Sequence, residues 1–158
     1  MRYLWIAVIA SVSLLAAAEK YTGPHPAKAD LPYLMHADNL IETEVSEARE
    51  ETRKDATVAV VPGNASKART PLAEPIFILR AEKLVPERIQ AYKLEVKNGT
   101  REVTIGLKRG KNSARPIFLN VTPLTGGLYK IEVDQPLENG QYCLSPEGSN
   151  ATFSFEVY

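Results

Sequence analysis

Few residues of the types that most often carry catalysis occur in this chain, and they are scattered. The sequence has one cysteine, Cys143, and two histidines, His25 and His36, which lack the spacing of zinc ligands. It has no HExxH or GxSxG motif, and no glycine-rich loop opens a helix to hold a phosphate group. The sequence therefore predicts a protein that is not an enzyme and that uses no metal or other cofactor.

One acidic stretch could supply paired carboxylates for hydrolysis. It holds five glutamates within ten residues: Glu42, Glu44, Glu47, Glu50 and Glu51. A run of this density is more often a solvated face of the protein. A small hydrolase or an enzyme inhibitor that acts through residues 42–51 is therefore kept as the alternative function.

Cys143 has three interpretations. Because it alternates with Tyr142 and Leu144, it should point to the opposite face of a strand from both. If that face is covered, the thiol is a small buried hydrophobe; if it is exposed, the thiol could form an intermolecular disulfide. Use as a nucleophile is the third interpretation, and it finds no histidine in the predicted β core to activate the sulfur.

A cationic loop is the second charged feature of the chain. Its members are Lys108, Arg109, Lys111 and Arg115, and they could bind an anionic polymer or an acidic partner surface. A solubilised hairpin end is the plainer interpretation of the same residues. Over the whole sequence, Lys+Arg 19 balances Asp+Glu 19, so no net field favours nucleic acid as a partner.

Four asparagines begin Asn-x-Ser/Thr sequons: Asn64, Asn98, Asn120 and Asn150. In a eukaryotic secretory pathway these positions would predict a glycoprotein. Asn98 and Asn150, however, stand where turns favour asparagine for conformational reasons.

The beginning of the chain predicts export. A basic Met1-Arg2 start, an apolar run over residues 3–15 and three alanines at 16–18 match the three parts of a signal peptide, which we assign to residues 1–18. Residues 19–38 carry three prolines and are expected to form an extended arm with one short strand over 33–36. Residues 39–158 are expected to form one domain, secreted or periplasmic, with no membrane span after cleavage.

The segment 39–55 fits both a helix and a strand. As a helix it would place Ile41, Val45, Ala48 and Thr52 on one face, which is a thin apolar stripe. As a strand, its β-branched residues alternate with acidic ones, and this pattern favours a strand for the first half of the segment.

Beyond Ala56 the sequence follows the two-residue period of β-strands. Asn98-Gly99 predicts a type I′ hairpin turn, which sets Glu95 opposite Glu102, a like-charge pair that Lys93 and Lys97 could relieve. Short strands separated by turn residues predict an all-β fold: an antiparallel, immunoglobulin-like sandwich of about seven to nine strands.

The segment Leu137-Glu138-Asn139-Gly140-Gln141-Tyr142 resembles the tyrosine corner of immunoglobulin-like sandwiches. The resemblance implies that Tyr142 donates a hydrogen bond to backbone a few residues upstream, that Leu137 fills the end of the core and that Gly140 permits a close approach. The chain departs from antibody domains in its cysteine, which follows the tyrosine directly and has no partner. The resemblance therefore implies no disulfide between sheets.

Three further segments resemble a group of small exported bacterial proteins of unestablished function. They are LPYLMHADNLIETE, AEPIF and LSPEGSN. The resemblance implies a periplasmic or extracellular address, makes the sequons accidental and supplies no catalytic residue. We therefore expect a non-catalytic binding or assembly module that engages a protein or polysaccharide of the envelope, with a structural envelope protein as a further alternative.

Overall fold

The computed structural model describes residues 17–54, 56–107 and 113–158. Within these residues the chain forms thirteen strands and one short 3-10 turn, Pro86–Arg88. The prediction of an all-β protein with antiparallel sheets is confirmed. The predicted strand number of seven to nine is too low, because residues 33–53 supply four short strands where the sequence indicated an arm and an ambiguous segment.

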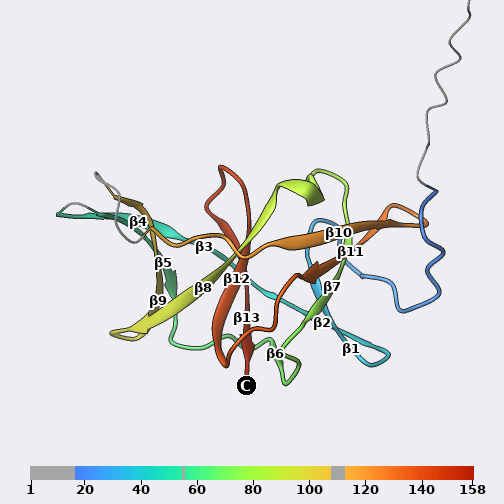
Figure 1. Ribbon diagram of the computed structural model, residues 1–158, viewed down its shortest axis with the longest axis horizontal. Coiled ribbons are helices and arrows are strands. Elements are labelled where there is room, and N and C mark those ends of the chain that lie inside the picture. Colours follow the sequence, from blue (N-terminus) through green and yellow to red (C-terminus); the bar gives the residue numbers. More distant parts are fainter. Residues whose placement is uncertain (1–16, 55, 108–112) are drawn as a thin grey trace, which may run out of the picture.

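The strands form two sheets (Figure 1). The first sheet is antiparallel and has the order β10 (Leu119–Leu124), β11 (Leu128–Val133), β7 (Ile76–Arg80), β1 (Tyr33–His36) and β2 (Asn39–Glu42). The second sheet has the order β3 (Glu44–Glu47), β13 (Ala151–Val157), β12 (Gly140–Pro146), β8 (Ile89–Lys97), β9 (Thr100–Leu107), β5 (Ala56–Pro62) and β4 (Arg49–Arg53). The short β6 (Arg69–Thr70) lies parallel to the end of β13.

Residues 19–38 lie against the first sheet and contain bends and turns besides one strand. The backbone N–H of Glu19 donates to the carbonyl of Pro123, and its own carbonyl accepts from the N–H of Thr125. The short strand expected over Tyr33–His36 is confirmed as β1, which pairs with β7. Its residues Tyr33 and Leu34 are buried, so this segment contributes to the core.

The described part of the ambiguous segment, residues 39–54, is built from strands, and the helical alternative is wrong. β2 belongs to the first sheet, whereas β3 and β4 lie at the two opposite edges of the second. Thr43 stands at the crossing between the sheets and is buried there, with its hydroxyl donating to the carbonyl of Pro32 at 2.7 Å. The chain thus passes from the first sheet to the second at Thr43 and continues as strands on both sides of it.

The hairpin register predicted at Asn98-Gly99 is confirmed. Both residues have positive φ, 51° and 79°, and Glu95 lies opposite Glu102. Of the two lysines expected to offset this like-charge contact, Lys97 does so by pairing with Glu95 at 2.5 Å, whereas Lys93 pairs with Glu138. Glu102 is held instead by Arg53 of β4, at 2.9 Å, because β9 is also flanked by the strand pair β5–β4.

The corner at the start of β12 has the hydrogen bond that its sequence predicts. The Tyr142 hydroxyl donates to the carbonyl of Glu138 at 2.8 Å, and Leu137 is buried in the same core. A β-carbon at Gly140 would lie 3.7 Å from the Tyr142 ring, which is an ordinary contact. Space beside the ring therefore does not by itself require glycine at this position.

β12 separates two hydrophobic cores. Tyr142 and Leu144 point between the two sheets, where Phe77 and Phe155 also lie. Cys143 points the opposite way, into a second core with Val61, Leu94 and Val103. The second core exists because the second sheet curls into a half-barrel, so that its concave face encloses side chains of its own.

The strand order of the second sheet requires this curl. β3 and β4 are the two edges of the second sheet, yet Ala48 alone separates them in sequence. The two edges must therefore meet at Ala48, where the backbone N–H donates to the carbonyl of Asn150 at 2.8 Å. On either side of this point the edges diverge, and the half-barrel stays open.

Candidate functional site

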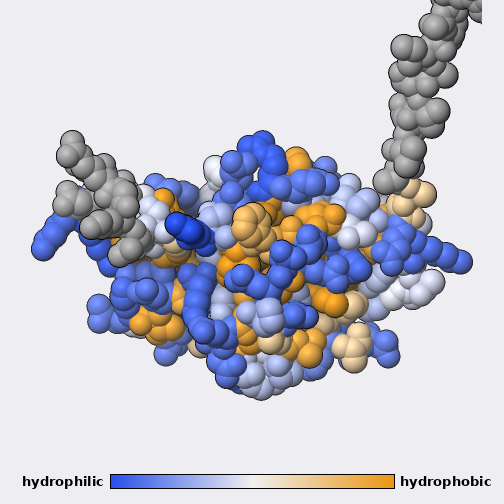
Figure 2. All heavy atoms as spheres, viewed as in Figure 1, coloured by the Kyte–Doolittle hydropathy of each residue, from blue (hydrophilic) through white to orange (hydrophobic). Residues whose placement is uncertain are grey.

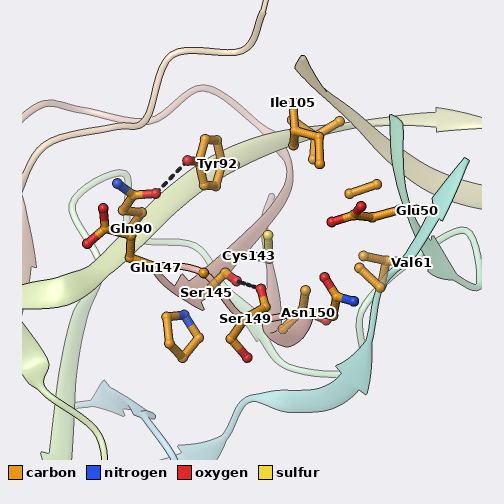
Figure 3. A pocket seen from close by; sticks show the side chains of 16 residues that line it. Glu50, Val61, Gln90, Tyr92, Ile105, Cys143, Ser145, Glu147, Ser149 and Asn150 are labelled. Atoms are coloured by element: carbon orange, nitrogen blue, oxygen red, sulfur yellow. Dashed lines mark hydrogen bonds between the residues drawn. The ribbon is translucent and has the colours of Figure 1, made fainter. Parts of the chain in front are cut away.

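A pocket of about 300 Å³ lies on the concave face of the curled sheet, where the two edges diverge from Ala48 (Figure 3). We call it the seam pocket. Its floor is apolar and includes Val61, Val103, Ile105 and Cys143. A volume near 300 Å³ is at the lower end of the range for small-ligand sites, so the seam pocket has room for a group of about one side chain or one small molecule.

The turn between β12 and β13 forms one wall of the seam pocket. Residues 145–150 line it, and Gly148 supplies the positive φ of 74° that lets the chain reverse. The hydroxyl of Ser145 donates to the carbonyl of Ala151 at 2.8 Å, and the hydroxyl of Ser149 accepts from the N–H of Ala151 at 3.1 Å. These hydroxyls are therefore engaged in holding the turn.

The opposite walls come from β4 and β8. Glu50 of β4 and Tyr92 of β8 both line the cavity, and Figure 3 shows them on different sides of it. The Tyr92 hydroxyl donates to the side-chain oxygen of Gln90 at 2.7 Å, which fixes the orientation of the half-buried ring. Burial raises the pKa of Tyr92, and the nearby Cys143 and Glu147 raise it further.

Two polar side chains of the rim have no hydrogen bond within the part of the chain that the structure describes. They are the carboxylate of Glu50 and the amide of Asn150, both exposed. The second carboxylate of the rim, that of Glu147, is paired with Arg88 at 3.2 Å. The seam pocket thus combines an apolar floor with two uncommitted polar groups, the arrangement by which binding sites orient a ligand.

Cys143 is a buried hydrophobe of the pocket floor, 2% exposed, which agrees with the first of its three interpretations. Burial raises the pKa of the thiol to about 12, and the positive charge of Arg101 opposes this rise only in part. The sulfur is therefore protonated at neutral pH and is a poor nucleophile.

We expect native Cys143 to react with an aromatic disulfide reagent at pH 8 at least about a hundredfold more slowly than the same chain unfolded in urea. The absorbance of the released thiol measures both rates. A Cys143→Ala variant that carries Ser113→Cys, an exposed position, should label rapidly in the folded state and controls for the reagent. Rapid labelling of the native wild-type protein would show that the floor of the seam pocket is open to solvent.

The same thiol should make stability depend on alkaline pH. Its pKa is higher in the folded chain than the ordinary value of 9.0, so the folded state binds the proton more tightly. The contribution to stability is complete below pH 9 and is lost as the pH rises toward 12. In urea titrations the wild-type protein should therefore lose stability relative to Cys143→Ala across that window.

The five glutamates of the acidic stretch are not brought together. Glu42 is bound by Lys28 at 2.8 Å and accepts a hydrogen bond from the Tyr33 hydroxyl at 3.1 Å, which leaves its pKa below the ordinary value. Glu44 is bound by Arg101 inside the half-barrel. The alternation of β-strands and the passage between two sheets send these side chains in different directions.

Two further glutamates of the stretch lie on opposite faces of β4. Glu51 is bound by Arg49 and Arg53, each at 2.6 Å, and these side-chain hydrogen bonds lower its pKa. Glu50 points into the seam pocket. Among the described residues no group of three histidine, cysteine, aspartate or glutamate side chains has the arrangement of a metal site. The paired carboxylates that hydrolysis would need are therefore not assembled from this stretch.

Of the other predicted surface features that the structure describes, one residue lines the seam pocket. Lys108, Arg109 and Lys111 fall outside the described residues, and Arg115 is exposed. The sequon asparagines are all exposed: Asn64, Asn98, Asn120 and Asn150. Asn150 alone among these asparagines lines the seam pocket, which the sequence did not indicate. No helix in the described residues is long and apolar enough to cross a membrane.

Arg101 is the main residue that sequence reasoning missed. Its side chain is wholly buried, and it donates to Glu44 at 2.5 Å and to the carbonyls of Pro62 at 2.6 Å and Gly63 at 3.1 Å. The signal was present, since the predicted hairpin places Arg101 on the same face as Val103, two residues on. A charged residue at a core-facing position needs a buried partner, and the hairpin alone did not identify one.

These features define a two-sheet, all-β protein in which one sheet curls around a small pocket with a polar rim. A scan of protein-family models and searches of curated proteins and of solved structures found no match to this chain. The resemblance to small exported bacterial proteins therefore stays a prediction.

Proposed function

We propose that the chain is an exported, non-catalytic binding or assembly module of the cell envelope or extracellular space, and that the seam pocket is its ligand site. The observation that carries the proposal is the pocket itself: an apolar floor beneath the uncommitted side chains of Glu50 and Asn150. Export is supported by the apolar run over residues 3–15 and the three alanines that follow it.

The immunoglobulin-like character of the fold is part of the same proposal. Its support is the hydrogen bond from Tyr142 to Glu138 and the packing of two antiparallel sheets around Phe77 and Phe155. In folds of this kind, loops and edges at the ends of a rigid sandwich commonly carry binding residues. The turn at 145–150 and the edge strand β4 are such elements here.

The chemistry of the seam pocket favours binding over catalysis. Its thiol is protonated at neutral pH, and neither His25 nor His36 lines it. His25 packs edge-on against the ring of Tyr21, with ring centres 5.8 Å apart. A nucleophile with an adjacent base, the usual arrangement for covalent catalysis, is not formed by the residues that line the seam pocket.

A fragment titration tests the proposal. Small polar fragments added to ¹⁵N-labelled protein should shift the amide resonances of residues 145 and 147–150 and of Tyr92, because these backbones surround the cavity. The Ile105→Trp variant places a large ring at the exposed end of the pocket floor, where Ile105 is 41% exposed, and should weaken the binding of such fragments at least about tenfold.

The matched control is Val45→Trp. Val45 is 61% exposed, and it lies on the other face of the curled sheet, because its partner Phe153 belongs to the core between the sheets. This variant should bind fragments as the wild-type protein does. The proposal fails if no fragment shifts the resonances around the seam pocket, or if Ile105→Trp and Val45→Trp affect binding equally.

A further inference from the structure

We infer that the seam pocket accepts an organic cation with an aliphatic stem: the side chain of a lysine or arginine presented by a partner protein, or a free alkylammonium ion. This inference rests on the proposed function and names the chemical class of its ligand. Three observations support it. The rim is negatively charged, the floor is apolar, and the hydroxyl groups beside the pocket already form hydrogen bonds within the protein.

The charge of the rim is negative. The residues that line the seam pocket include two carboxylates and no lysine, arginine or histidine within the described part of the chain. Glu147 already has Arg88 as its partner, with both side chains more than half exposed. Glu50 has no ion-pair partner among the described residues, so it is the carboxylate that a positively charged ligand would meet.

The two faces of β4 differ in how their charged side chains are paired. Arg49, Glu51 and Arg53 point to one face of the strand, where Glu51 pairs with both arginines and Arg53 also pairs with Glu102. Glu50 points to the other face, over the cavity, and stands opposite Ala59 of β5, which brings no charge. If the glutamates of β4 served only to make this edge soluble, we would not expect the paired carboxylate to lie on one face and the carboxylate over the cavity to lack a partner among the described residues.

The floor fits an aliphatic stem. Val61, Val103 and Ile105 offer apolar surface, while the half-buried ring of Tyr92 forms the wall across from Glu50 (Figure 3). Lysine and arginine bury their methylene groups along such surface and keep the charged head at the rim. A cation over the face of a tyrosine ring gains a further attraction from the ring quadrupole.

A neutral sugar fits the seam pocket less well. Recognition of hydroxyl groups needs several free donors and acceptors, but the hydroxyls of Ser145 and Tyr92 already donate to Ala151 and Gln90, and that of Ser149 accepts from the backbone of the turn. Asn150 is the amide that stays free at the rim. An anion would meet Glu50 without a compensating cation, which disfavours it.

A second candidate surface lies beside β10. Phe118 is 79% exposed and borders a shallow groove with Ile117 and Leu119. The face of the molecule drawn in Figure 2 carries hydrophobic residues interspersed with hydrophilic ones. The structure does not indicate what would cover this groove, so no ligand is assigned to it.

The experiment compares probes that differ in charge and little in shape. The cationic probes are Nα-acetyl-lysine methylamide and Nα-acetyl-arginine methylamide, and their neutral counterparts are the Nε-acetylated lysine derivative and the citrulline derivative. Hexylammonium and hexanoate test a free amine and an anion. Binding is measured from the amide resonances that report on residues 145–150 and Tyr92.

The cationic probes should bind about tenfold more tightly than their neutral counterparts, since an exposed ion pair and a cation–ring contact both add to the affinity. Glu50→Gln should reduce this preference about fivefold. Glu47→Gln, an exposed glutamate on the opposite face of the curled sheet, should leave it unchanged.

The outcomes separate the inference from the function on which it rests. If neutral probes or hexanoate bind the seam pocket as tightly as the cations, the assigned ligand class is wrong and the binding site stands. If no probe and no fragment shifts the pocket resonances, the proposed function fails as well. If hexylammonium binds and the amino-acid derivatives do not, the ligand is a free amine, which supports the cation assignment.

Discussion

Replacing Arg101 by methionine is expected to lower the free energy of unfolding by about 3 kcal/mol, the lower end of the range for removing one partner of a buried ion pair. The guanidinium is fully buried, and its loss leaves Glu44 without its cation and the carbonyls of Pro62 and Gly63 without their donors. The expected loss is at the low end because the Glu44 side chain is 25% exposed and can be partly hydrated.

Equilibrium unfolding in urea, followed by far-ultraviolet circular dichroism, measures this change. Arg49→Met is the matched control, since Arg49 is 75% exposed in its pair with Glu51 and its loss should cost less than about 1 kcal/mol. The double variant Arg101→Met, Glu44→Gln should recover about 1 kcal/mol, because it removes the uncompensated charge. Equal losses of stability in Arg101→Met and Arg49→Met would show that the buried contacts of Arg101 do not stabilise the half-barrel.

Replacing Phe155 by alanine should have a similar or larger effect, about 3 to 5 kcal/mol. The Phe155 ring is fully buried and contacts both sheets: it meets Phe77 of β7 edge-on, with ring centres 5.0 Å apart, and stacks on Tyr142 of β12 at 5.5 Å. Its removal leaves a cavity between the sheets that neither can fill without moving. The midpoint of urea unfolding should fall accordingly.

Two substitutions make the Phe155 test specific. Phe155→Leu keeps most of the volume and should cost less than half as much as the alanine variant. Phe118→Ala removes an equal ring from a side chain that is 79% exposed, and should change stability by no more than about 0.5 kcal/mol. A Phe155→Ala protein as stable as Phe118→Ala would mean that the two sheets do not pack through this residue.

Local features of the fold were predictable from the sequence. The Asn98-Gly99 turn and the pairing of Glu95 with Glu102 follow from two residues that accept positive φ and from the two-residue period of a strand. The opposite directions of Tyr142 and Cys143 follow from the same period, and the hydrogen bond of Tyr142 spans four residues. Each of these features depends on neighbours in the chain.

The segment 39–55 shows why other features were harder to predict. Val45, which would belong to the apolar face of either a helix or a strand, is 61% exposed because β3 is an edge strand. The hydrophobic pattern therefore does not mark a core there. β2 and β4 pair with their neighbours β1 and β5, but β3 pairs with β13, where Ser46 lies opposite Thr152, 106 residues away in sequence. This distant pairing decides the conformation of the middle of the segment.

The candidate site shows the same division. The composition indicated a chain with few residues of the types that carry catalysis, and the acidic stretch was visible in the sequence. Nothing in that stretch distinguished Glu50 from the other glutamates. Glu51 is neutralised by Arg49 and Arg53, and Glu44 by Arg101, which is 57 residues away in sequence. Only the folded chain shows that Glu50 lies over a cavity and has no ion-pair partner among the described residues.

The sequence by itself determined the β class, the hairpin at 98–99, the alternation along β12 and the hydrogen-bonded corner at Tyr142, because turn conformations and the strand period are properties of adjacent residues. The tertiary structure decided that the second sheet curls, that its edges meet at Ala48 and that Glu50, Tyr92 and Asn150 surround one pocket. The physical reason is that a curl arises from the summed twist and pairing of seven strands, and no short segment contains that information.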